Sequence, residues 1–164
     1  MNYQLSIIVA IANNNAIGKD NNLLAYLSND LKWFKKNTLD KTVIMGRKTF
    51  DSLPNGALPK RTNIVLTRNK DFKAENCIVL DDFQKVFNHL NQDAENFIMG
   101  GAEIYRHFLP FVDKLYITRI HADFDADVFF PEINFDEWNL IEKIENKVDE
   151  KHKFDYDFLI YLRK

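Results

Sequence analysis

The sequence is poor in the residues that build disulfide-bonded or metal-binding proteins. Its 164 residues include a single cysteine, Cys77, together with five glycines and four prolines. One cysteine excludes an intrachain disulfide and a zinc site made of several cysteines, and we expect no metal. The formal net charge is −2. The chain therefore lacks the excess of positive charge that would favour a nucleic-acid partner or an anionic membrane surface.

Long apolar segments are also missing. The apolar run at residues 7–12 is too short to span a bilayer, and no basic segment precedes it. We therefore expect a cytoplasmic protein with no membrane partner. Apolar residues are nevertheless abundant, at 46% of the chain with 14 phenylalanines. A chain of this length can bury roughly 70% of its unfolded surface without a disulfide or metal, so we expect one domain over residues 1–164.

Apolar, β-branched segments alternate along the chain with segments of helical spacing. The strands expected from this pattern cover residues 5–12, 41–45, 61–68, 78–80, 96–99 and 114–120. Residues 13–22 are rich in asparagine and predict a long loop. Residues 141–148 and 154–162 are expected to pair as an antiparallel hairpin. The pattern predicts a single-domain α/β fold, with a central mixed, mainly parallel twisted sheet, flanking helices and this C-terminal hairpin.

One charged side chain shares the apolar face of a predicted helix. In the helix expected at 28–37, Leu27, Leu31 and Phe34 recur at helical spacing. Asp30 lies three residues after the first and four before the last, so it points with them. A carboxylate on such a face needs a partner. It is either an acid stabilised by the helix dipole in the first turn or a ligand-binding group.

Two predicted strands end at glycine directly before a helix, at Gly46 and at 100–101. In an open α/β sheet, ligands bind beyond the carboxyl ends of the strands, where helix N-termini attract phosphate. Arg47, Lys48 and Arg68 follow neighbouring strands and together can hold a phosphate. Neither junction has the G-x-G-x-x-G spacing, so both can also be tight packing turns beside ordinary surface cations. A later predicted helix is expected to be capped by Asp81 and to extend to Leu90.

Four motifs follow one another in a specific order. They are LLAYLSNDLKWF at 23–34, VIMGRKTF at 43–50, LPKRTNI at 58–64 and IMGGAEIY at 98–105. Together they resemble dihydrofolate reductase of the bacterial chromosomal type, in order and spacing, over essentially the whole chain. The resemblance implies an oxidoreductase that reduces 7,8-dihydrofolate to 5,6,7,8-tetrahydrofolate by hydride transfer from NADPH and so supplies one-carbon metabolism. We expect the protein to be a monomer.

On this resemblance, the pterin pocket is centred on Asp30, whose carboxylate accepts two hydrogen bonds from the amidine-like edge of the ring. Arg61 is implied to pair with the glutamate carboxylate of folate. Thr118 acts through Asp30, and Ile8 through its backbone carbonyl. The implied catalytic residues are Asp30, Leu23 and Thr118. The implied substrate-binding residues are Ile8, Ala10, Asp30, Leu31, Phe34, Leu53, Leu58, Arg61 and Thr118.

The resemblance also implies an NADPH site. Residues 46–49 correspond to the phosphate-contacting turn, and residues 100–105, with a cis peptide between the two glycines, to the pyrophosphate and nicotinamide side. Asp127 matches the residue that partners the loop over the nicotinamide. The implied cofactor-binding residues are Ala10, Ile17, Gly18, Asn21, Leu23, Gly46, Arg47, Lys48, Thr49, Leu66, Thr67, Arg68, Gly100, Gly101, Ala102, Glu103, Ile104 and Tyr105.

The sequence departs from the family pattern at three positions. Ala25, Ser28 and Val128 stand where tryptophan, proline and threonine are common, and none of these changes removes a group that the chemistry requires. Two other functions stay open. A pyrimidine reductase of riboflavin synthesis shares the expected fold and the NADPH side. A pterin- or nucleotide-binding module without turnover would predict damage at Asp30 or at 100–101, where the sequence is intact.

Overall fold

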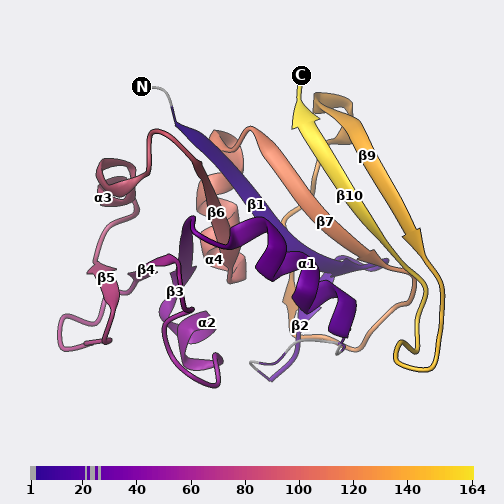
Figure 1. Ribbon diagram of the computed structural model, residues 1–164, viewed down its shortest axis with the longest axis horizontal. Helices are drawn as coiled ribbons and strands as arrows, with labels where there is room; N and C mark the ends of the chain where they lie inside the picture. The colour runs from indigo at the N-terminus through magenta and orange to yellow at the C-terminus, as the bar shows by residue number, and fades with distance from the viewer. Residues whose placement is uncertain (1–2, 21, 23–24, 26) are drawn as a thin grey trace.

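The apolar segments form one eight-stranded sheet in the order β5-β4-β3-β6-β1-β7-β10-β9 (Figure 1). This computed structural model describes residues 3–20, 22, 25 and 27–164. The strands of the sheet are β1 (Gln4–Ala12), β3 (Thr42–Gly46), β4 (Thr62–Leu66), β5 (Cys77–Leu80), β6 (Glu95–Gly100), β7 (Lys114–Ile120), β9 (Trp138–Asn146) and β10 (Tyr156–Arg163).

The sheet is parallel from β5 to β7 and antiparallel at its C-terminal edge. The neighbouring pairs β4–β5, β3–β4, β3–β6, β1–β6 and β1–β7 are parallel. The hairpin of β9 and β10 joins the edge of β7 antiparallel to it. The α/β fold with a mixed, mainly parallel sheet and a C-terminal hairpin is therefore confirmed. Within the described part of the chain, no helix has both the length and the apolar character needed to cross a membrane.

Helices cover both faces of the sheet. They are α1 (Ser28–Thr38), α2 (Arg47–Asp51), α3 (Phe83–Val86) and α4 (Ala102–Phe108), with 3-10 turns η1 (Phe87–His89), η2 (Leu109–Phe111) and η3 (Phe135–Glu137). In Figure 1, α1 crosses in front of the sheet and α4 lies behind β6. The alternation of side chains along the strands supplies both faces with apolar groups.

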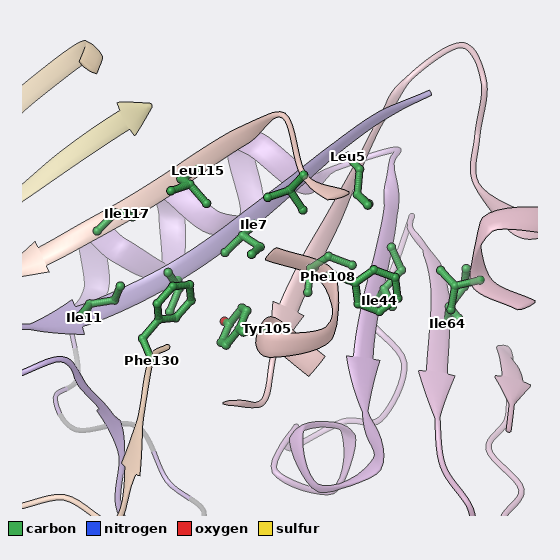
Figure 2. Close-up of a cluster of buried hydrophobic side chains, with 14 of the residues drawn as sticks. Leu5, Ile7, Ile11, Ile44, Ile64, Tyr105, Phe108, Leu115, Ile117 and Phe130 are labelled. Atoms are coloured by element: carbon green, nitrogen blue, oxygen red, sulfur yellow. The ribbon is translucent and has the colours of Figure 1, made fainter. Parts of the chain in front are cut away.

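The core on the α4 face is the larger of the two. Leu5, Ile7 and Ile11 of β1 are completely buried there and pack with Tyr105 and Phe108 of α4 (Figure 2). These three β1 residues are separated by even numbers of positions, which is the spacing of one strand face.

The opposite face holds α1 in place. Ile8 of β1 points to this face and packs in a cluster with Trp33 and Phe34 of α1. The indole of Trp33 also stacks on Phe158 of β10, with ring centroids 4.4 Å apart and planes 4° apart. Packing of this kind fixes the position of the helix on the sheet, and with it the position of Asp30.

Three local expectations were wrong. The asparagine-rich segment contains a short strand, β2 (Ala16–Gly18), which pairs antiparallel with β8 (Val128–Phe129). The cap of α3 is Asp82, whose side chain accepts a hydrogen bond from the Gln84 N–H at 2.8 Å, while Asp81 makes an ion pair with Lys85. The helix is also shorter than expected, because the chain tightens to a 3-10 turn before Leu90.

Candidate active site

The carboxyl ends of the parallel strands open into one large cleft. Its volume is about 1460 Å³, which exceeds the roughly 300–1,000 Å³ of a pocket for one small molecule. Residues of β1, α1, β7 and both strand–glycine–helix junctions line it. The cleft therefore lies where ligands bind in open α/β sheets, and it has room for two of them.

Most of the site residues expected from the sequence line this cleft. They are Ile8, Ala10, Ile17, Gly18, Asp30, Leu31, Phe34, Gly46, Arg47, Lys48, Thr49, Leu53, Leu66, Thr67, Arg68, Gly100, Gly101, Ala102, Glu103, Ile104, Tyr105 and Thr118. Asn21 and Leu23 were also expected, and they lie outside the described residues.

Among the expected residues that the structure describes, Leu58 and Arg61 do not line the cleft. Leu58 packs against the same apolar cluster as Phe34 and Leu53, and its backbone exchanges hydrogen bonds with the side chain of Asn63, both 2.9 Å long. Arg61 donates to the Thr38 hydroxyl at 3.1 Å, and its guanidinium carbon lies 6.0 Å from the centre of the Phe34 ring. Since Phe34 itself lines the cleft, Arg61 stands directly beside the site.

Asp30 supplies a carboxylate to the end of the cleft that lies beside β7. It is half-buried in the first turn of α1, and its Oδ1 accepts a hydrogen bond from the Thr118 hydroxyl at 2.5 Å. Burial raises the pKa of Asp30, and the bond from Thr118 opposes this rise. Its Oδ2 has no hydrogen-bond partner within the described parts of the chain. The carboxylate is therefore placed to accept hydrogen bonds from a ligand.

Apolar side chains surround this carboxylate. Leu31 and Phe34 follow it on α1, and Leu53 faces the same cleft from the segment after α2. Leu31 is 41% exposed, although it lies on the apolar stripe of the helix. An apolar side chain left open in a cleft is available to pack against a flat apolar ligand.

The two glycine junctions pack against each other. A Cβ atom on Gly46 would lie 3.1 Å from Cγ1 of Ile104, and one on Gly101 would lie 3.5 Å from the Thr49 hydroxyl. Gly100 has a φ of +127°, which only glycine adopts readily. The Gly100–Gly101 peptide is cis. Glycine at these positions brings two turns of backbone together at the surface of the cleft.

Cations gather on the side of the cleft that β3 and β4 form. Arg47 makes an ion pair with Asp51 at 2.8 Å, and Arg68 makes one with Glu103 at 3.4 Å. Lys48 lines the cleft beside Arg47. Because α2 has five residues and α4 seven, we assign attraction for an anion to these side-chain charges rather than to the helix dipoles. In the strand order this side is separated from β7 by β6 and β1.

The comparison with known sequences decides the family. A sequence profile described as dihydrofolate reductase matches residues 4–163. The chain belongs to the dihydrofolate reductase family. The dihydrofolate reductase of Haemophilus influenzae is 46% identical over 159 residues, which cover 97% of this chain and 98% of that protein. That of Staphylococcus haemolyticus is 41% identical over 160 residues, which cover 98% of this chain and 96% of that protein.

A solved structure agrees with the sequence comparison. Dihydrofolate reductase from Enterococcus faecalis, complexed with NADP(H) and RAB-propyl, superposes with a TM-score of 0.90 at 36% identity. The match covers 98% of this chain and 96% of that one. The membership inferred from the four motifs is therefore confirmed, together with the fold.

The family resemblance also singled out Asp127, and the structure places it against the β2 segment. Its Oδ2 accepts a hydrogen bond from the Asp20 N–H at 3.0 Å, and its N–H donates to the carbonyl of Gly18 at 3.2 Å. Lys19 and Asp125 form an ion pair beside these bonds. These contacts hold the β2 segment at the edge of the cleft.

The structure adds lining residues that sequence reasoning missed or named only as departures from the family. Asp81, Phe83 and Lys85 follow β5, which pairs with β4. The rule that ligands bind beyond the carboxyl ends of parallel strands pointed to Arg47 and Arg68, and it could have found these three residues as well. The Phe83 ring stacks on His107 at 4.8 Å, a contact without a sequence signal. The additional lining residues are Val9, Lys19, Asn22, Ala25, Ser52, Pro54, Asn69, Asp81, Asp82, Phe83, Lys85, Met99, His107 and Val128.

Proposed function

We propose that this protein reduces 7,8-dihydrofolate to 5,6,7,8-tetrahydrofolate with NADPH, and that both molecules bind in the cleft described above. The observation that carries the proposal is Asp30, a carboxylate held by Thr118 among apolar side chains inside a cleft of two-ligand size. Membership of the dihydrofolate reductase family supports the same reaction.

At the substrate end, we assign recognition of the pterin to Asp30. An ionised carboxylate accepts two parallel hydrogen bonds from an amidine-like N–C–N edge, which makes the contact charge-assisted and directional. Leu31, Phe34 and Leu53 pack on the pterin and the benzoyl group. Arg61 lies beside Phe34 and keeps N–H groups beyond its bonds to the Thr38 hydroxyl and the Pro59 carbonyl. These groups are assigned to the glutamate carboxylate of the substrate.

The same carboxylate is assigned to proton delivery. Its negative charge stabilises a proton on the ring nitrogen next to the carbon that receives the hydride, and the proton arrives through water. Thr118 keeps Asp30 in place and opposes the rise of its pKa on burial. Leu23 remains a catalytic residue on the strength of the family resemblance alone.

The residues at the β3–β4 side fit NADPH. NADPH supplies the hydride when it is bound. Arg47 and Arg68 are assigned to the phosphate on its adenosine ribose, which distinguishes it from NADH. The backbone of residues 100–105 is assigned to the pyrophosphate and nicotinamide, because glycine lets a ligand approach this turn closely.

We further propose that one copy of the chain, acting as a single domain, is sufficient for activity, and that the enzyme is cytoplasmic. All assigned groups come from a single chain, so the site requires no contribution from a second copy. Size-exclusion chromatography with light scattering tests the monomer, and a dimer at assay concentration would contradict it. Localisation is tested by fractionating cells of the source organism.

The decisive experiment follows the absorbance of NADPH with and without dihydrofolate and identifies the product by chromatography. We expect oxidation that depends on dihydrofolate and yields tetrahydrofolate. Oxidation that instead requires the phosphorylated aminopyrimidine of riboflavin synthesis would replace the proposal. Binding of both molecules without oxidation would show a binding module that lacks turnover.

A further inference from the structure

The helix that carries Asp30 begins without a cap from its own sequence. Its N-cap residue is Leu27, which has no side-chain hydrogen bond to offer the first turn. The first N–H groups of a helix have no partner within it. The Asp30 N–H reaches the carbonyl of Leu27 at 3.0 Å, which leaves the Asn29 N–H to be satisfied from elsewhere in the chain.

A histidine from the β9–β10 loop supplies this partner. His152 is 1% exposed, and its Nε2 accepts the Asn29 N–H at 3.3 Å. The hydroxyl of Ser28 lies 3.3 Å from the same nitrogen. The other ring nitrogen, Nδ1, lies 2.7 Å from Oδ1 of Asp149. Because Nε2 accepts a hydrogen bond, the ring proton belongs on Nδ1, which donates to Asp149.

The loop that presents the ring is itself closed by Asp149. The same Oδ1 atom accepts the N–H groups of Lys151 and His152, both at 2.8 Å. A second link from the hairpin reaches Asn29, whose side-chain amide donates to the Tyr156 hydroxyl at 2.9 Å. Asn29 is thus held through its backbone and its side chain, and the next residue is Asp30.

We propose that His152 is a positioning residue for the reduction of dihydrofolate. Its neutral imidazole takes the place of the missing cap and fixes the first turn of α1. The Asp30 carboxylate is thereby held at Thr118 and toward the cleft. The inference rests on the proposed function, since the position of the turn affects catalysis only if Asp30 binds the substrate.

Two substitutions of His152 test its hydrogen bonds to Asn29 and to Asp149 separately. In His152→Gln, the amide oxygen can stand where Nε2 stood and accept the Asn29 N–H, while the bond to Asp149 is lost. In His152→Asn, the shorter amide can replace Nδ1 toward Asp149 but cannot reach Asn29. His121→Asn is a control for the loss of a histidine–carboxylate contact as such, because Nε2 of His121 lies 2.9 Å from Oδ2 of Asp157 and the hydrogen bonds of the described residues do not link this ring to α1.

The expected result is a loss confined to the substrate side. His152→Asn should lower kcat/KM for dihydrofolate by about 3- to 30-fold, the range for loss of a helix cap when the turn acts on the reacting group. The Kd for NADPH should stay within about twofold, and the stoichiometry of the same titration counts the folded molecules. His152→Gln and His121→Asn should both remain near the wild type. A fall in NADPH binding equal to the fall in kcat/KM, or identical values for the Asn and Gln variants, would overturn the inference.

A double-mutant cycle shows whether His152 acts through Asp30. In the background of Asp30→Asn, adding His152→Asn should leave the hydride-transfer rate within about twofold, because the group being positioned is already absent. Independent losses that multiply would assign His152 a merely structural role and overturn the inference.

One measurement needs neither variants nor turnover. In ¹⁵N NMR spectra of the wild type at neutral pH, His152 should show a protonated Nδ1 and an unprotonated Nε2 that is hydrogen-bonded to the Asn29 amide. A protonated Nε2 would overturn the inference. Failure of the wild type to oxidise NADPH with dihydrofolate would instead overturn the proposed function, and the two failures are therefore distinguishable.

Discussion

The two ends of the cleft hold their charged groups in opposite ways. Asp30 is half-buried, and Thr118, to which it is bonded, lies 88 positions further along the chain. Arg47 pairs with Asp51 only four positions away, and their side chains are 40% and 42% exposed. A charge in an apolar pocket interacts more strongly than an exposed one, which water and salt screen. We therefore expect one substitution to cost more at the substrate end than at the cofactor end.

The largest effect is expected from Asp30→Asn, which keeps the shape of the side chain and removes its charge. Loss of one partner of a buried charged pair costs about 3–5 kcal/mol. Hydride transfer at neutral pH should therefore slow by about two to four orders of magnitude. Part of the rate should return at acidic pH, where dihydrofolate is protonated in solution. Stopped-flow measurement of the hydride step across the pH range checks both statements.

The control for this substitution is Asp40→Asn. Asp40 is exposed just beyond the C-terminal end of α1, and its φ of 63° is one that asparagine also adopts. Its activity should equal that of the wild type. If Asp30→Asn transferred hydride at the wild-type rate, this would contradict the role assigned to the carboxylate. It would also contradict the expectation that substitutions cost more at the substrate end of the cleft.

A smaller and more selective effect is expected from Arg47→Ala. A charge-assisted hydrogen bond is worth about 1.5–3 kcal/mol, so the Kd for NADPH should rise by about 10- to 100-fold, toward the lower end because Arg47 is exposed. The Kd for NADH and the affinity for dihydrofolate should change little. Fluorescence titration with both cofactors measures this, with Arg106→Ala as the control because Arg106 is exposed on α4 without lining the cleft. Equal losses for NADPH and NADH would place the arginine at the shared pyrophosphate.

Thr118→Val tests how the substrate end keeps its charge. The Thr118 hydroxyl opposes the rise that burial imposes on the pKa of Asp30, so its removal should raise that pKa further. The ionised form then appears only at higher pH, and the acidic limb of the hydride-transfer profile should move to higher pH. Loss of one such bond, about 1.5 kcal/mol, corresponds to a roughly tenfold slower step at neutral pH. Thr62→Val is the control, because Thr62 is an exposed residue at the start of β4. An unshifted profile in Thr118→Val would contradict the coupling.

The smallest effect is expected from Ala25→Trp. Ala25 lines the cleft and packs near Leu27 and Phe158, where the family commonly has tryptophan. The larger side chain adds an N–H donor that orders water and lowers the dielectric near Asp30. We expect turnover to persist with a changed pH profile of the hydride step. Profiles that overlay would show that position 25 lies outside the proton path and is a packing variant.

Much of the proposed substrate end of the cleft could be predicted from the sequence, because the pattern that identifies it involves residues close together in the chain. Asp30 stands on an apolar stripe of a helix, and 3.6-residue spacing places it inward without any tertiary information. The strand–glycine–helix junctions at Gly46 and 100–101 were visible for the same reason. The full set of roles came from the resemblance that four motifs carry, and the family membership is confirmed.

Other features depend on contacts between distant segments. The pairing of β2 with β8 joins residues about 110 positions apart, and neither segment alone has the length or alternation that predicts a strand. Leu58 was expected in the pocket, and the structure adds hydrogen bonds between its backbone and the side chain of Asn63 that the sequence did not predict. Each of these outcomes follows from long-range packing or from a polar side chain that satisfies a buried backbone group.

The sequence by itself determined the class of fold, the family and the identity of the central carboxylate, because periodicity, glycine chemistry and motif order are properties of neighbouring residues. Only the tertiary structure decided which groups meet that carboxylate. The Thr118 hydroxyl reaches it because β7 lies beside β1 in a specific register, and His152 caps its helix because the β9–β10 loop folds over the start of α1. Such meetings depend on the geometry of the whole sheet, which no single segment encodes.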